Sequence, residues 1–159
     1  MTLPAIPEEY TLPVSRQDWP DLLADWKPIL PEAFTPWVLT KFGELFVSTA
    51  HCGIGVLRVS GFEYERVAND EKDFREWLVD PDKVTEWFLA PLVDRLEKSG
   101  RLLGTEQCYS FVQALGLGGP LSAENVTVLS IRNHFCGWGK VFRQVGGLPP
   151  GTEVIVKPQ

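Results

Sequence analysis

The sequence predicts an α+β protein, a single domain in which a mostly antiparallel sheet packs against two to four helices. Segments in which apolar and polar residues alternate, as in strands, lie at 44–68 and again at 126–145. Segments with the apolar spacing of helices lie before and between them. The chain has 159 residues, of which 44% are hydrophobic, so one domain with a buried core is expected.

The N-terminal region is expected to be an extended arm followed by helix. Three prolines lie within the first 14 residues and favour extended backbone. Ser15 offers a helix cap, and the following apolar residues keep helical spacing up to the proline at position 28. A second short helix is predicted over 35–41, with Pro36 in its first turn.

From Gly43 the pattern changes to a period of two. It predicts strands over 44–48, 55–59 and 62–68, which would form a three-stranded meander. Asp70 is then a candidate cap for a helix over 71–79. Asp80 and the proline after it begin a further helix that ends near position 100 and is kinked or split by its internal proline at position 91.

The last third of the chain is predicted to form a hairpin. A short strand is expected at 109–112 and a glycine-rich turn at 116–119. The hairpin would join strands at 126–132 and 140–145 through a Gly-Trp-Gly turn at 137–139. A Pro-Pro-Gly turn at 149–151 would lead into a last strand at 154–156.

The charge is unevenly distributed along the chain. Its net value is −6, and residues 63–86 alone hold nine acidic and four basic residues, whereas residues 87–159 carry a net charge of +2. Direct nucleic-acid binding is not expected, because phosphate recognition needs a basic face. The acidic band would instead steer a basic protein partner toward the chain, or it is a solvated helix face that aids solubility.

The sequence shows no recognisable catalytic or phosphate-binding motif. The glycine-rich segment at 116–119 is followed by proline and leucine, not by the Lys-Ser/Thr of a phosphate loop. Four residues are weak candidates for a zinc site or a Cys-His nucleophile, namely His51, Cys52, His134 and Cys136. Their spacing is unusual for zinc, and buried cysteines with ordinary polar histidines are the alternative. The chain is therefore predicted to be a non-enzyme without cofactor or metal.

The expected compartment is the cytoplasm. Three cysteines without a CxxC pair fit a reducing environment better than a disulfide framework. The N-terminal stretch has neither the basic nor the apolar region of a signal peptide, and no apolar run approaches the roughly 20 residues of a membrane span.

Three segments together resemble a known family. They are Leu-Thr-Lys-Phe-Gly-Glu-Leu-Phe at 39–46, the block from Gln107-Cys-Tyr-Ser to Leu-Gly-Gly-Pro-Leu-Ser-Ala-Glu-Asn at 117–125, and Gly-Trp-Gly-Lys-Val-Phe-Arg-Gln-Val at 137–145 followed by Leu-Pro-Pro-Gly-Thr at 148–152. The likeness spans roughly residues 26 to 154 and is to the C-terminal domain of type VI secretion immunity proteins that neutralise a DNase effector. In that family a GAD-like region often precedes the domain, so residues 1–25 are interpreted as a GAD-like remnant and residues 26–159 as the immunity-protein-like domain.

The resemblance implies a small bacterial α+β protein that binds and blocks a cognate toxin such as a DNase effector. The alternatives are a regulatory or interaction protein with a non-toxin partner, and an enzyme or small-ligand binder that uses the histidines and cysteines named above. Genes beside this one would separate the first two, since a neighbouring nuclease gene favours the immunity function.

The predicted contact with a basic partner lies on the acidic helices, together with a tryptophan at the hairpin tip. Its candidate residues are Asp70, Glu71, Asp73, Glu76, Asp80, Asp82 and Trp138. Trp138 would either be an exposed anchor or fold back onto the sheet. Reversing Asp70, Glu71 and Asp73 to lysine is expected to slow association and leave the fold intact. An exposed edge strand would also allow a homodimer.

Overall fold

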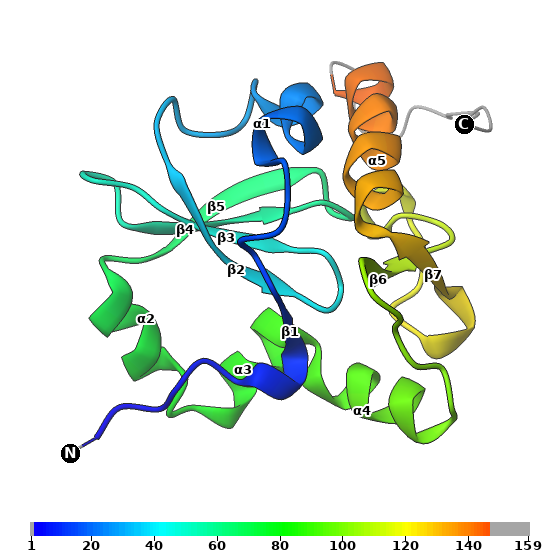
Figure 1. The fold of residues 1–159 in the computed structure, drawn as a ribbon, viewed down its shortest axis with the longest axis horizontal. Coiled ribbons are helices and arrows are strands. Elements are labelled where there is room, and N and C mark those ends of the chain that lie inside the picture. The colour runs from blue at the N-terminus through cyan, green and yellow to red at the C-terminus, as the bar shows by residue number, and fades with distance from the viewer. Residues whose placement is uncertain (1, 147–159) are drawn as a thin grey trace.

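The computed structural model describes residues 2–146 and has the predicted α+β architecture (Figure 1). A five-stranded antiparallel sheet has the order β1-β2-β3-β4-β5, and a two-stranded antiparallel sheet pairs β6 with β7. The strands are β1 (Thr11–Leu12), β2 (Thr35–Thr40), β3 (Leu45–Ser48), β4 (Ile54–Arg58), β5 (Glu63–Ala68), β6 (Gln107–Phe111) and β7 (Val126–Ser130).

Helices surround the sheets. They are α1 (Trp19–Leu22), α2 (Glu71–Trp77), α3 (Pro81–Phe88), α4 (Ala90–Lys98) and α5 (Ile131–Val145), with the short 3-10 helices η1 (Glu8–Tyr10), η2 (Ala24–Trp26), η3 (Leu115–Leu117) and η4 (Ala123–Asn125). From β3 to α4 the element order agrees with the predicted strands and helices, whereas β1 and β2 are strands that the sequence pattern does not predict.

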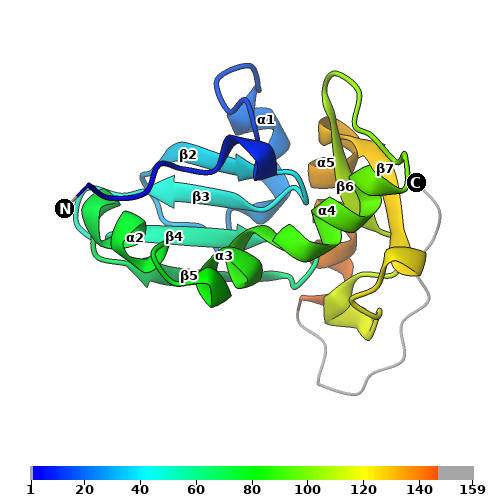
Figure 2. The same cartoon turned by 90° about the horizontal axis from the view of Figure 1, so that it is seen from below.

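The five-stranded sheet is covered on both faces, because its buried residues alternate along each strand. Leu45 and Val47 of β3 belong to a core with α1, η2 and α5, whereas Phe46 between them packs in a second core with α2 and α3. A third core joins α4 to β6 and β7 through residues such as Val93 and Tyr109. The helices α2 and α3 therefore form an outer layer on one face of the sheet (Figure 2).

Local capping signals behave as predicted around α2, α3 and α4. Asp70 accepts a hydrogen bond from the backbone N–H of Asp73, and Asp80 accepts one from the backbone N–H of Asp82. The predicted split before the internal proline falls at Leu89, whose φ of 52° ends α3 and begins α4.

The predicted helix over 35–41 is wrong, since this segment is strand β2. It pairs with β3 through Thr35–Ser48 and Leu39–Leu45 and contains a bulge between Pro36 and Val38. The strand buries the adjacent Val38 and Leu39 in the cores on opposite faces of the sheet. In a helix these two adjacent side chains could not reach opposite faces of the sheet, so one of the two cores would lack its side chain from this segment.

The predicted hairpin after β7 is also wrong. Only residues 126–130 form a strand, and the Gly-Trp-Gly segment together with 140–145 lies within α5. Ser130 caps α5 by accepting a hydrogen bond from the backbone N–H of Asn133. Ile131, Phe135 and Phe142 then give a helical stripe that is buried in the core with α1 and η2.

Gly139 is a site of close helix approach and not part of a turn. A Cβ at this position would lie 2.9 Å from the Cβ of Asp25 and 3.0 Å from Nε1 of Trp26. The absence of a side chain therefore lets α5 approach η2 closely. The predicted turn at 149–151 and strand at 154–156 lie outside the described residues.

Candidate functional site

Trp138 lies on α5 and not at a hairpin tip. Its side chain is half-buried against the core with α1 and η2, and its indole N–H donates a hydrogen bond of 3.0 Å to Oγ of Ser110 on β6. The hairpin tip, from which an exposed Trp138 anchor was predicted, is therefore absent.

His134 occupies a buried polar network beside Trp138. Its Nε2 is 3.0 Å from the carbonyl oxygen of Gly43, so Nε2 carries the proton and donates to that carbonyl. Its Nδ1 then accepts the hydroxyl proton of Ser110 at 2.8 Å. This network ties α5 to β6 and to the β2–β3 turn.

The Ser110–His134 pair has the residue types of a nucleophile and its base but is sealed from solvent. Both residues are buried, at 0% and 1% exposure, and burial lowers the pKa of His134 to about 4. A substrate has no access to the Ser110 hydroxyl in this arrangement. The pair therefore has a structural role, which is to join α5 to β6.

The four weak metal candidates do not gather into a ligand set. His51 and Cys52 are exposed in the β3–β4 loop, while His134 has both ring nitrogens engaged by protein atoms. Within residues 2–146 no group of three or more His, Cys, Asp or Glu side chains is arranged to hold a metal ion.

Glu44 is a buried carboxyl on the β2–β3 turn. Burial raises its pKa to about 7, and this effect outweighs the opposing attraction of Arg58, whose Nη1 is 3.5 Å from Oε2 of Glu44. Arg58 also pairs with Glu63 and Glu65 on β5, at 3.3 Å and 2.9 Å. These two carboxylates of the acidic band thus belong to a separate cluster around one arginine.

The acidic residues predicted as a partner contact lie on α2 and α3, the outer layer of the sheet (Figure 2). Seven acidic and three basic residues fall within 70–86, which gives a local net charge of −4. Most of the carboxylates are exposed. The structure therefore places the predicted residues of this band on one side of the molecule, apart from Trp138 on α5 (Figure 1).

The carboxylates of α2 and α3 differ in what they already bind. Asp70 and Asp80 cap their helices, and Asp73 accepts a hydrogen bond of 2.8 Å from the backbone N–H of Asn69. Glu71 and Asp82 make no side-chain hydrogen bond or ion pair with any part of the chain that the structure describes. The capping residues hold the local fold, whereas the free ones are available to a partner.

Two apolar residues at the α2–α3 connection were missed by the sequence interpretation. Trp77 is 44% exposed and Val79 is 59% exposed, and the predicted helix over 71–79 contains both. Leu78 between them is buried in the core with α2 and α3. Helical spacing alone does not reveal this exposure, because Trp77 is the last residue of α2 and Val79 follows the end of that helix.

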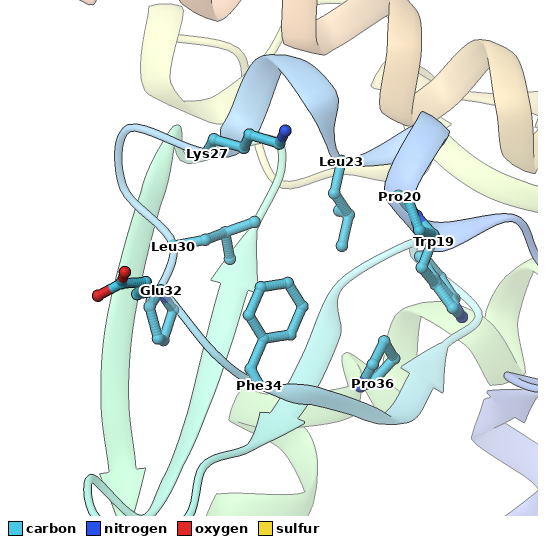
Figure 3. Close-up of a pocket in the computed structure, with 9 residues that line it drawn as sticks. Trp19, Pro20, Leu23, Lys27, Leu30, Glu32, Phe34 and Pro36 are labelled. Carbon is cyan, nitrogen blue, oxygen red and sulfur yellow. The ribbon is translucent and has the colours of Figure 1, made fainter.

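A pocket of about 600 Å³ lies on the other side of the sheet, near α1. Its lining is mostly apolar, and Figure 3 shows Leu23, Leu30 and Phe34 turned toward one another. The lining residues are Trp19, Pro20, Leu23, Lys27, Leu30, Pro31, Glu32, Phe34 and Pro36. The pocket contains no residue of the predicted contact.

In the described part of the chain, none of the helices has the length and apolar character that crossing a membrane requires. The fold and the surface thus define an α+β protein in which an acidic pair of helices, α2 and α3, lies over one face of the sheet.

Residues 68–136 match the family model described as T6SS immunity protein Tdi1, C-terminal. The matched segment begins at the last residue of β5, contains all of α2, α3 and α4, and ends within α5. The match confirms the resemblance of this segment to type VI secretion immunity proteins. No curated protein matches the chain.

Proposed function

We propose that this chain is an immunity protein that binds a cognate type VI effector toxin and neutralises it without catalysis. The family match carries the proposal, because the matched segment includes the whole acidic surface of α2 and α3. The exposed carboxylates and the exposed Trp77 give that surface the charge and the apolar area of a protein contact.

The toxin that fits this surface best is a nuclease acting in the cytoplasm. A nuclease grips phosphates with basic residues, so its active cleft is positively charged. The net charge of −4 over 70–86 attracts such a cleft and speeds association at low salt. Occupation of the cleft by α2 and α3 would block the nucleic-acid substrate directly.

Growth protection tests this function. The genes beside this one are searched for a type VI effector, and each candidate effector is expressed from an inducible promoter in a bacterial host, with and without this chain. The proposal expects growth and intact DNA only when the chain is present. Growth arrest and DNA damage that continue despite equal amounts of soluble chain would refute it.

The role of the acidic surface needs variants that leave the helix caps in place. Reversal of Asp70 and Asp73 would remove capping hydrogen bonds as well as charge, so these positions are unsuitable. Glu71→Lys, Glu76→Lys and Asp82→Lys keep both cap residues and change exposed carboxylates, of which Glu76 also forms an exposed ion pair with Lys72 at 3.9 Å. The triple variant is expected to associate more slowly with the effector and to lose most of the salt dependence of the association rate.

The control for this triple variant is a charge reversal of equal size away from α2 and α3. Asp18 and Glu32 are exposed on the α1 side of the sheet, and Glu124 is exposed on η4. Their reversal to lysine changes the net charge by the same amount as the first triple variant does. A difference between the two variants must therefore come from the position of the charges and not from the total charge. Equal slowing by both triple variants would remove α2 and α3 as the contact.

A further inference from the structure

We propose that the connection between α2 and α3 is the anchor of the partner contact, with Trp77 receiving a basic side chain of the partner. This inference rests on the proposed function and names the residue on which the contact is centred. We call the exposed Trp77 and Val79, together with Glu76, Asp80, Asp82 and Glu86, the Trp77 corner.

The Trp77 corner is rigidly held although its two apolar side chains are exposed. The backbone N–H of Asp80 donates a hydrogen bond of 3.1 Å to the carbonyl oxygen of Trp77, and the side chain of the same Asp80 caps α3. Leu78, between Trp77 and Val79, is buried in the core with α2 and α3 and so holds the connection against the sheet. A rigid exposed tryptophan offers a large contact area at a small cost in conformational entropy on binding.

The indole of Trp77 already holds a cation of the chain itself. The Nζ of Lys83 lies 5.2 Å from the centroid of the Trp77 ring and 5.6 Å from that of Trp87. The same Nζ is 2.9 Å from Oε2 of Glu86. An ammonium between indole rings and a carboxylate is the arrangement in which cation–π attraction and charge attraction act together.

The chemistry of this position fits an arginine or lysine of a basic partner. An arginine from the partner would stack on the exposed part of Trp77 and pair with the surrounding carboxylates, because a planar guanidinium does both. Val79 supplies apolar contact next to it. The residues that contribute most to protein binding are often tryptophans, and they lie near the centre of an interface with other contacts around them. Trp77 with its surrounding carboxylates has this arrangement.

The pocket near α1 lies apart from the Trp77 corner. Its lining lies at residues 19–36, outside the matched segment 68–136. The Trp77 corner lies entirely inside that segment and carries the charge that a basic partner needs.

Affinity measurement with the purified toxic domain of the effector encoded beside the gene tests the anchor. Trp77→Ala is expected to raise the Kd about 30-fold or more, the effect of losing a central aromatic contact. Val79→Ser is expected to raise the Kd by a smaller factor and cannot unfold the chain through loss of a buried group, since Val79 is mostly exposed. Lys83→Gln, which removes the competing cation, is expected to preserve binding or tighten it.

The matched control is Leu121→Ala. Leu121 is 59% exposed, equal to Val79, and lies inside the matched segment on the loop before η4, across the molecule from α2 (Figure 1). Its Kd is expected to equal that of the unaltered chain. Thermal unfolding of every variant establishes that it is folded.

The outcomes separate the anchor from the function. If the unaltered chain binds and Trp77→Ala and Val79→Ser bind equally well, the anchor is refuted and the immunity function stands. If the unaltered chain neither binds the toxic domain nor protects growth, the proposed function is refuted and the anchor with it.

Discussion

Two buried groups with opposite pKa shifts make a sharp prediction about stability and pH. Burial lowers the pKa of His134 from 6.5 to about 4 and raises the pKa of Glu44 from 4.5 to about 7. The perturbation is to remove each group in turn, as His134→Gln and Glu44→Gln, and to measure the free energy of unfolding between pH 4.5 and 6.5.

The two groups act in opposite directions in this window. Unfolded His134 is protonated below pH 6.5 while the folded residue stays neutral, so its contribution to the free energy of unfolding is lost as the pH falls toward 4. Glu44 holds its proton in the folded state up to about pH 7 but loses it near 4.5 when unfolded. Its contribution is therefore complete below pH 4.5 and is lost as the pH rises toward 7.

The size of each effect follows from the shifts. Each covers roughly 2.5 pH units, which corresponds to about 3 kcal/mol in the free energy of unfolding, or about 1.4 kcal/mol per pH unit. Because the folded chain keeps one extra proton on Glu44 and lacks one on His134, the two slopes cancel in the unaltered protein. The pair alone thus gives no net pH dependence between 4.5 and 6.5.

When either group is removed, the pH dependence that the other group gives to the free energy of unfolding becomes measurable. In Glu44→Gln the free energy of unfolding should fall, relative to the unaltered chain, by about 1.4 kcal/mol for each unit of acidification. In His134→Gln it should rise by a similar amount, and the double variant should again match the slope of the unaltered chain. Urea denaturation at five pH values measures all four slopes. Identical slopes in the four proteins would refute the assignment of opposite shifts.

Three further predictions concern packing, capping and reactivity. Gly139→Ala is expected to lower the free energy of unfolding by roughly 1–2 kcal/mol despite the better helix propensity of alanine, because its Cβ would meet the Cβ of Asp25 at 2.9 Å; denaturant unfolding measures it. Asp70→Ala should cost about 1 kcal/mol through loss of the α2 cap, which thermal unfolding will show as a lowered Tm. Cys108, whose pKa burial raises to about 12, should resist a thiol reagent at pH 8 in the folded chain while the exposed Cys52 reacts, as followed by absorbance of the released product.

The parts of the fold that the sequence predicts well are those set by local rules. The strands β3, β4 and β5 follow one another with short connections, so alternation alone predicts them. The caps Asp70 and Asp80 act on the residues directly after them. In both cases the determining contacts lie within a few residues along the chain.

Of the two wrong assignments, only that of α5 depends on contacts that are distant in sequence. The segment of β2 has a proline and residues compatible with a helical turn, but it pairs with β3, which follows after a four-residue turn, and with β1. In α5 the two glycines favour a turn locally. Gly139, however, is needed where α5 crosses η2, more than 100 residues earlier in the chain. The partner of Gly139 is not visible from the segment of α5 alone.

The candidate site was predictable in its charge but not in its centre. The acidic residues of α2 and α3 follow from composition, whereas the exposure of Trp77 depends on where α2 ends over the sheet. Trp138 is the opposite example: it was a candidate for an exposed anchor but is half-buried, because its place on α5 directs its indole N–H to Ser110. The positions of aromatic residues relative to the layers require the three-dimensional fold.

The most direct test of the account is the affinity between the purified chain and the toxic domain of the effector encoded beside its gene, measured at low and at high salt. The account predicts tight binding at low salt, weaker binding at high salt, and loss of that salt dependence in the Glu71, Glu76 and Asp82 charge-reversal variant. Absence of binding at low salt, or binding that neither salt nor this variant changes, would contradict it.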